Sequence, residues 1–239
     1  MGHYSDKDEA RQVVWDRMNQ PGVASFPFPA QGRIPNFVAS RRAAERLFEE
    51  EPWRSARRLK VNPDAPQRPV RLLALQRGIT VYMPTPRLRA GFLELDPTRI
   101  PPEEYAAAVS LSRGKKWQVE VPLQKMPPID AIVTGSVAVT PAGARCGKGA
   151  GYADLEYAIL CELGLKPVPV ATTVHDVQLV TALPVSDSDL PLHCIVTPTQ
   201  TFRTGAAPNQ SRQIDWDQLS AERIANMPPL QALRTLRER

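Results

Sequence analysis

The chain has 239 residues, of which 42% are hydrophobic and 23% charged, and it carries a net charge of +5 with a pI near 9.3. That length can bury a substantial core, so we expect one large α/β domain rather than two small ones. Three cysteines without paired spacing argue against a disulfide scaffold and favour a reduced, cytoplasmic protein. No apolar run approaches the roughly 20 residues that cross a bilayer, and the first residues lack an apolar signal region.

The N-terminal segment predicts a helix that is capped by Ser5 and runs to about Met18. Lys7 and Arg11 are one turn apart and therefore lie on one face of this helix. On spacing alone, a solvated face is the simpler interpretation.

Positive charge is dense between residues 41 and 71. A solvated mixed surface is the leading explanation, because Glu45 and residues 49–51 interrupt the run. A site for an acidic ligand comes second, and nucleic acid third, since no aromatic platform or reading motif accompanies the charge. The basic residues are Arg41, Arg42, Arg46, Arg54, Arg57, Arg58, Lys60, Arg68 and Arg71.

An alternation of strands and helices begins near Leu59, and it predicts right-handed crossovers and a mostly parallel sheet. Tyr82 and Pro84 end one of the predicted strands, at the carboxyl edge where open α/β sheets bind ligands. An ordinary strand end explains them nearly as well. The expected strands are residues 59–61, 79–83, 92–95, 129–133, 168–174, 177–180 and 193–196.

The most informative stretch is Arg145-Cys146-Gly147-Lys148-Gly149-Ala150-Gly151-Tyr152-Ala153-Asp154. It lies between the predicted strand 129–133 and a helical pattern that ends at Gly164. Glycines let the backbone approach a ligand closely, and a helix start offers free N–H groups to an anion. Lys148 and Arg145 add positive charge, so phosphate suits the loop best. The spacing is neither that of the Walker loop nor that of the dinucleotide fingerprint, and a flexible turn remains the alternative.

Two aspartates that follow the glycines of this stretch are candidate functional residues. Asp154 follows the glycine loop, and Asp189 lies in the segment Leu183-Pro184-Val185-Ser186-Asp187-Ser188-Asp189-Leu190-Pro191. Taken separately, Asp154 is explained as a helix-start carboxylate and Asp189 as a turn residue. The cysteines and histidines show no zinc-ligand spacing.

The end of the chain changes composition. Residues 204–213 are rich in Gly, Ala, Pro, Asn, Gln and Ser, which is typical of a linker. We therefore divide the chain into a domain over residues 1–202 and a linker with a helical tail over residues 203–239.

The glycine loop resembles the signature R-x-G-x-G-x-G-Y-Y-D of the 5-formyltetrahydrofolate cyclo-ligase (methenyltetrahydrofolate synthetase) family. The chain departs from the signature at Ala153, where the family has a second tyrosine. This form is similar to a divergent, cyclo-ligase-like branch, some members of which lack the ligase activity. The matching residues are Arg145, Gly147, Gly149, Gly151, Tyr152 and Asp154.

The resemblance covers about residues 5–202 and implies a three-layer α/β/α fold with a mostly parallel sheet. Sugar-phosphate isomerases and CoA transferases share this kind of fold. The implied reaction is the ATP- and Mg²⁺-dependent cyclisation of 5-formyltetrahydrofolate to 5,10-methenyltetrahydrofolate, with release of ADP and phosphate. The partner would be a small reduced folate, and the protein a monomer or homodimer.

The resemblance also implies roles for individual residues. Lys148 and Arg145 would be catalytic, and Asp154 and Asp189 would hold Mg²⁺. Tyr82, Pro84 and Tyr152 would line the folate side. The ATP-binding residues would be Lys7, Arg11, Arg145, Gly147, Lys148, Gly149, Gly151 and Tyr152.

The substrate side of the resemblance is incomplete. Typical members hold the folate with a glutamate, for which Glu45 is the nearest candidate without a secure register. One alternative is therefore a cyclo-ligase-like protein that binds a nucleotide or a ligand related to folate or thiamine without this cyclisation. A second alternative is an RNA-associated protein that uses a basic face.

Overall fold

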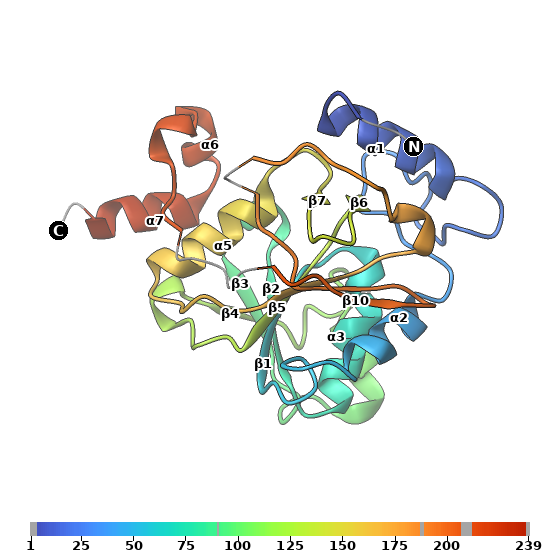
Figure 1. Cartoon of the computed structure of the whole chain (residues 1–239). Helices are drawn as coiled ribbons and strands as arrows, with labels where there is room; N and C mark the ends of the chain where they lie inside the picture. The colour runs from blue at the N-terminus through green and yellow to red at the C-terminus, as the bar shows by residue number, and fades with distance from the viewer. Residues whose placement is uncertain (1–3, 90, 187–188, 207–211, 238–239) are drawn as a thin grey trace.

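The computed structural model describes residues 4–89, 91–186, 189–206 and 212–237, and it shows a twisted eight-stranded sheet between helices, with a separate two-stranded hairpin (Figure 1). The strand order is β10-β9-β8-β5-β1-β2-β3-β4. Strands β2, β1, β5, β8 and β9 are parallel neighbours, whereas β3, β4 and β10 pair antiparallel at the edges. The strands are β1 (Arg58–Val61), β2 (Thr80–Pro84), β3 (Phe92–Leu95), β4 (Val119–Val121), β5 (Ala131–Thr134), β8 (Val170–Thr173), β9 (Cys194–Val196) and β10 (Thr201–Arg203).

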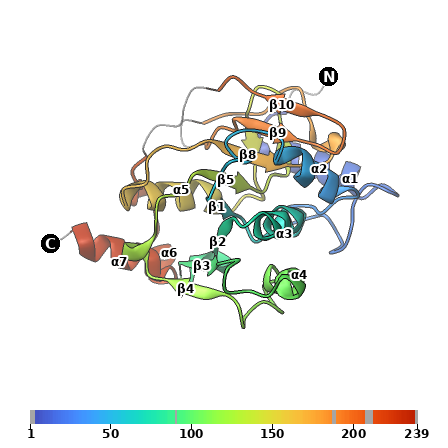
Figure 2. The same ribbon diagram turned by 90° about the horizontal axis from the view of Figure 1, so that it is seen from below.

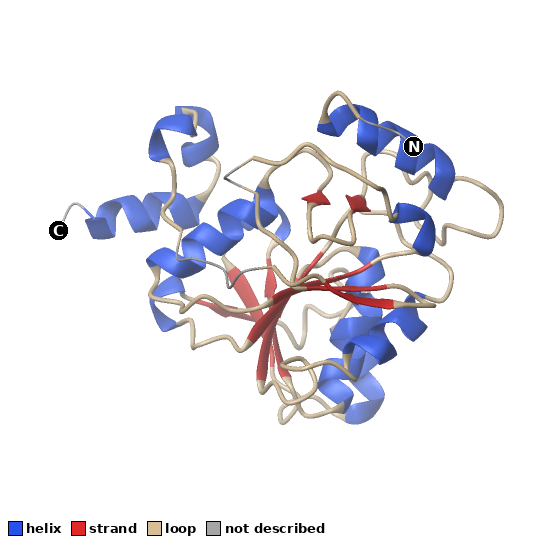
Figure 3. Ribbon diagram, in the orientation of Figure 1, coloured by secondary structure: helices blue, strands red, loops and turns tan. Residues whose placement is uncertain are grey.

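Helices cover both faces of the sheet (Figures 2 and 3). One face carries α2 (Ser40–Leu47), α3 (Arg68–Gln76) and α4 (Tyr105–Ala108), and the other carries α5 (Tyr152–Glu162). A separate apolar cluster lies under each layer of helices. The central strands are buried on both sides, which explains why β5 and β8 consist of four buried residues each. The predicted three-layer α/β/α architecture is confirmed.

A small hairpin delivers the glycine loop to the carboxyl edge of the sheet. Strands β6 (Ala138–Val139) and β7 (Arg145–Cys146) lie between β5 and α5 in the sequence and pair with each other in antiparallel orientation. Helix α1 (Lys7–Met18) packs against both of these strands. The first two residues of the signature, Arg145 and Cys146, therefore lie in a strand, and the glycines after Cys146 form the loop proper.

Three details of the predicted elements are wrong. The N-cap of α1 is Asp6, whose carboxylate accepts hydrogen bonds from the backbone N–H groups of Asp8 and Glu9 at 2.8 and 2.9 Å. The predicted strand 177–180 begins as a 3₁₀ turn, because the buried amide of Gln178 donates to the carbonyls of Ser136 and Val137. Strands β4, β6, β7 and β10 have no counterpart among the predicted strands.

The basic run between residues 41 and 71 is not one solvated surface. Lys60 and Arg71 are each only 2% exposed. Lys60 contacts Glu156, and Arg71 donates to the carbonyl groups of Asn62 and Val109. Burial of these two cations divides the run and weakens the interpretation as a nucleic-acid-binding face.

The C-terminal tail packs on the body of the protein. Helices α6 (Ala221–Ala225) and α7 (Pro228–Arg237) follow one another, and α7 contacts α5. Met227, Leu230 and Leu233 are buried in the same apolar cluster as α5. Residues 207–211 of the predicted linker lie outside the described residues, and the division at residue 202 stays a prediction. No helix in the described ranges is both long and apolar enough to span a membrane.

Leu230→Ala should test this packing. Leu230 is fully buried, so the truncation should lower the free energy of unfolding by about 2–4 kcal/mol, as measured by urea denaturation. Val185→Ala is the control, because Val185 is exposed and its loss should change stability by less than about 0.5 kcal/mol. Equal, small effects of both substitutions would show that the tail contributes nothing to the core.

Candidate functional site

A cleft of about 1670 Å³ opens at the carboxyl edge of the parallel strands. Its walls come from α1, the segment after β1, the glycine loop, the start of α5, the segment around Asp189 and the tail. Every residue predicted to bind nucleotide or metal lines this one cleft. They are Lys7, Arg11, Arg145, Gly147, Lys148, Gly149, Gly151, Tyr152, Asp154 and Asp189.

The backbone of the glycine loop is arranged as a set of free donors. Gly149 and Gly151 have φ values of +99° and +62°, which glycine adopts without strain. Within the described part of the chain, the N–H groups of residues 147–151 have no hydrogen-bond acceptor. Gly151 is also the N-cap of α5 and provides no capping side chain. Free amides at a helix start form a ready anion site.

Cationic side chains surround this loop. Arg11 donates from Nε to the carbonyl of Gly147 at 2.7 Å, and its Nη1 contacts the carboxylate of Asp8. Lys148 lies 3.6 Å from Asp64, and Lys7 contacts the carboxylate of Asp189. These charges favour an anionic ligand over a neutral one.

Arg145 is the most constrained of the cations. Arg145 is 7% exposed, and its Nη1 lies 3.4 Å from Oδ1 of Asp154. Its Nε is buried and has no hydrogen-bond partner within the described residues. Buried donors are nearly always paired in native proteins, so this nitrogen marks a place for an acceptor that a phosphate oxygen would supply.

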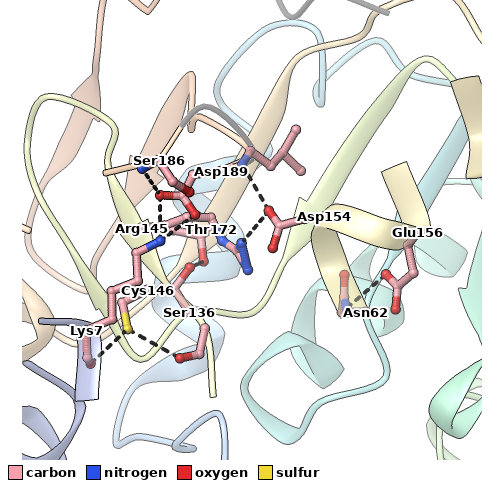
Figure 4. A network of polar contacts seen from close by, with 12 residues as sticks. Lys7, Asn62, Ser136, Arg145, Cys146, Asp154, Glu156, Thr172, Ser186 and Asp189 are labelled. Carbon is pink, nitrogen blue, oxygen red and sulfur yellow. Dashed lines mark hydrogen bonds and ion pairs between the residues drawn. The ribbon is translucent and has the colours of Figure 1, made fainter. Parts of the chain in front are cut away.

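The two predicted metal ligands lie on the same side of the cleft (Figure 4). Oδ1 of Asp154 accepts a hydrogen bond at 2.9 Å from the backbone N–H of Leu190, the residue after Asp189. Oδ2 of Asp189 accepts from the N–H of Ser186 at 2.8 Å. No cluster of three or more His, Cys, Asp or Glu side chains suited to a metal occurs in the described ranges. Two carboxylates nevertheless fit Mg²⁺, which takes its remaining ligands from water and phosphate oxygens.

The predicted folate wall is only partly at the cleft. Tyr152 lines it, but Tyr82 and Pro84 do not, although Thr85 and Pro86 immediately after them do. The Tyr82 hydroxyl is buried and donates to Glu94 at 2.7 Å, and burial raises the pKa of this phenol. A role of Tyr82 and Pro84 in substrate binding stays a prediction.

Glu45 is not part of the cleft. It lies on the exposed face of α2 and forms an ion pair with Arg41 at 2.9 Å. Four acidic residues for which the sequence predicted no role also line the cleft: Asp64, Glu156, Asp215 and Glu222. Asp64 lies three residues after the end of β1, and a position just beyond a parallel strand was a usable signal. Glu156 stands as a charged residue within the apolar run of α5.

The tail contributes a further cation. Arg223 donates to the carbonyl of Ala150 at 2.8 Å, and its guanidinium lies 5.7 Å from the centre of the Tyr152 ring. Residues of the tail between Arg212 and Met227 line the cleft. No local sequence pattern pointed to Arg223, because its contacts depend on how the tail docks.

Cys146 and His175 are structural. Burial raises the pKa of the Cys146 thiol, so it stays protonated near neutral pH and is a poor nucleophile. Burial lowers the pKa of His175, which keeps its ring neutral while Nδ1 accepts a hydrogen bond from the N–H of Val177. All three cysteines are free and buried.

Comparison with known proteins decides the family. A sequence model described as the 5-formyltetrahydrofolate cyclo-ligase family matches residues 7–198. The chain belongs to this family. A mouse "Methenyltetrahydrofolate synthase domain-containing protein" is 42% identical over 98% of the chain, and the human protein of the same name is 37% identical over 95%. The chain spans 63% and 61% of these two relatives.

The cyclo-ligases themselves are more distant. The Escherichia coli 5-formyltetrahydrofolate cyclo-ligase is 36% identical over 31% of the chain and 39% of its own length. A solved structure of Aquifex aeolicus 5,10-methenyltetrahydrofolate synthetase matches with a TM-score of 0.53 at 15% identity. That match covers 89% of this chain and 99% of the other, and it confirms the fold.

The free amides and surrounding cations predict binding of a bare polyphosphate. Tripolyphosphate at a hundredfold excess over its Kd should stabilise the protein by about 2.7 kcal/mol, seen as a rise in Tm that shrinks with added salt. Arg11→Ala should abolish most of this rise, because it removes a charge and frees the carbonyl of Gly147. Lys115→Ala, an exposed residue outside the cleft, is the charge-matched control. The same rise in Tm for both variants would contradict a phosphate site at the loop.

Proposed function

We propose that the cleft catalyses the ATP- and Mg²⁺-dependent cyclisation of 5-formyltetrahydrofolate to 5,10-methenyltetrahydrofolate, or a closely related ATP-dependent reaction. The observation that carries the proposal is the loop of free N–H groups beside the unpartnered Nε of Arg145 and the carboxylates of Asp154 and Asp189. Membership of the cyclo-ligase family supports it.

Each residue has a distinct part in this proposal. The amides of residues 147–151 and Arg145 bind the phosphates, and Lys7 and Arg11 neutralise them from α1. Lys148 stabilises the charge that develops as the γ-phosphoryl group moves to the formyl oxygen. Asp154 and Asp189 hold Mg²⁺, which when bound neutralises phosphate charge. Tyr152 faces the folate.

The chemistry has two steps. The formyl oxygen attacks the γ-phosphorus and ADP leaves, which converts a poor leaving group into a phosphate ester. N10 of the folate then adds to the formyl carbon, loses its proton, and expels phosphate to leave the methenyl bridge. The contribution of the protein is positioning and charge neutralisation, as in phosphoryl transfer generally.

Binding of Mg-ATP would replace ion pairs within the cleft by ion pairs with the ligand, so that no charge is left uncompensated. Lys7 contacts Asp189 and Arg145 lies beside Asp154, so each carboxylate is compensated by a cation before any ligand arrives. An incoming Mg-ATP brings phosphate oxygens for the cations and a metal for the carboxylates. The exchange keeps the cleft close to neutral in both states, which limits the electrostatic cost of closing it.

One observation favours a second candidate. Glu45, the nearest candidate for the folate-binding glutamate of the family, lies on the exposed face of α2. In addition, Ala153 replaces the second tyrosine of the signature. An ATP-dependent reaction on a different acceptor, or binding of a nucleotide or a folate- or thiamine-related ligand without cyclisation, fits these departures.

The direct test mixes the purified protein with Mg-ATP and 5-formyltetrahydrofolate and follows methenyl absorbance. Growth of the absorbance together with ADP release supports the cyclisation. ADP release without methenyl product supports a different acceptor. Absence of both overturns the proposal of an ATP-dependent reaction on this substrate.

Lys148→Ala should lower turnover by roughly 10²-fold or more, because it removes a charge that acts on the transition state. Lys115→Ala should leave turnover unchanged. Turnover of the Lys148 variant equal to that of the wild type would remove this residue from the chemistry, even if ATP still bound.

Asp154→Asn should separate metal binding from folding. The asparagine oxygen can still accept the hydrogen bond from Leu190, so the protein should still fold, with a Tm lowered by loss of the 3.4 Å ion pair with Arg145. The Mg²⁺ concentration for half-maximal turnover should rise by at least the roughly tenfold that follows loss of a group supporting a metal. An unchanged Mg²⁺ requirement would exclude Asp154 as a ligand.

A further inference from the structure

A buried charged cluster forms part of the cleft floor beside the glycine loop. Lys60 of β1, Asn62 just after β1, and Glu156 of α5 are 2%, 6% and 4% exposed. Lys60 contacts Oε2 of Glu156 and donates to Oδ1 of Asn62 at 2.8 Å. Nδ2 of Asn62 donates to the same Oε2 at 3.3 Å (Figure 4).

Stability gives no reason for such a cluster. Desolvation of a buried ion pair costs several kcal/mol per ion, and apolar residues of similar volume often serve the fold as well or better. The layer between the sheet and α5 is largely apolar around it, with Ile132, Leu155 and Ile159 buried. A charged pair in this layer therefore points to a use other than packing.

The cluster presents one unused acceptor to the cleft. Asn62 and Glu156 line the cleft, whereas Lys60 lies behind them. Both donors of the cluster converge on Oε2, and Oε1 of Glu156 accepts no hydrogen bond from a described residue. A carboxylate oxygen has room for two donors, so Oε1 is built to receive one from outside the chain. Lys60 opposes the rise in the pKa of Glu156 that burial causes.

The cleft is polarised by this arrangement. The loop side offers N–H groups and cations, which suit phosphate. The β1 side offers acceptors, namely Glu156 and the carboxylate of Asp64, whose charge also acts on Glu156. A ligand that binds the loop and also reaches Glu156 therefore needs a hydrogen-bond donor where it meets this carboxylate.

We propose that Glu156, held by Lys60 and Asn62, binds the ring of the acceptor substrate, an amino-substituted nitrogen heterocycle that donates an N–H to Oε1. Reduced pterins and aminopyrimidines both belong to this class. The proposal deepens the proposed function by assigning the substrate side of the same cleft, and it rests on that function for the placement of ATP on the loop side.

The test uses the full chain and calorimetric titration with 5-formyltetrahydrofolate, 2-amino-4-hydroxypyrimidine and Mg-ATP. Glu156→Gln keeps the shape of the side chain but removes its charge. The affinity for both ring compounds should fall roughly tenfold or more, the value of a hydrogen bond to a charged group. The affinity for Mg-ATP should stay unchanged. Wild-type affinity of this variant for the ring compounds would overturn the proposal.

A second variant tests the proposal even if Glu156→Gln fails to fold. Replacement of the pair by apolar residues, Lys60→Met with Glu156→Leu, should preserve or raise Tm because no unpaired charge is left. The doubly substituted protein should still bind Mg-ATP and should lose the ring compounds. Retention of ring binding in this stable variant would show that the cluster is structural.

The outcomes separate this proposal from the proposed function. Wild-type protein that binds the ring compounds through Glu156 but forms no methenyl product refutes the cyclisation and supports the ring site. Methenyl formation that is unaffected by Glu156→Gln supports the cyclisation and refutes the ring site. Failure of the wild type to bind either ring compound at millimolar concentration overturns the ring site.

Discussion

The site depends on which way the peptide groups of the glycine loop point. In a planar trans peptide, the carbonyl and the N–H of the same unit point in opposite directions. Arg11 binds the carbonyl of Gly147, and Arg223 binds that of Ala150. The N–H groups of Lys148 and Gly151 in those same units are thereby aimed away from the two arginines. Two cations outside the loop thus fix a cradle of donors inside it.

The charges of the cleft follow from this cradle. Donors and cations gathered in one place repel each other and lack counter-charge when no anion is bound. Asp189, Asp154 and Asp64 supply that counter-charge to Lys7, Arg145 and Lys148 respectively. Two of these pairs join segments that are far apart in sequence: Lys7–Asp189 holds α1 against the segment around Asp189, and Lys148–Asp64 holds the loop against the segment after β1. Compensation of charge and assembly of the cleft are the same set of interactions.

Much of the fold was predictable because local pattern determines it. Buried parallel strands give continuous apolar runs, and the glycine-rich stretch before a helical pattern correctly predicted a loop that leads into the start of α5. The spacing of Lys7 and Arg11 also predicted correctly that the two share a face, which the structure places on the cleft. What it could not show is the partner of Lys7, because Asp189 lies 182 residues away.

The failures have a common physical cause. Residue type alone favours exposure for Lys60 and Arg71, but partners from distant elements make their burial possible. The predicted strand 177–180 failed for a similar reason, since the side chain of Gln178 binds backbone carbonyls of another segment. In each case a long-range polar contact overrode a local preference.

The tail contributes residues to the cleft. Its apolar residues pack on α5, and this docking places Arg223 over Tyr152 and against the loop carbonyl. The loop is therefore bracketed by a residue from α1 near one end of the sequence and one from α6 near the other. The family model ends at residue 198, whereas the mouse relative aligns over 98% of the chain. The contact from Arg223 of α6 to the loop is thus made by a part of the chain that lies beyond the family model.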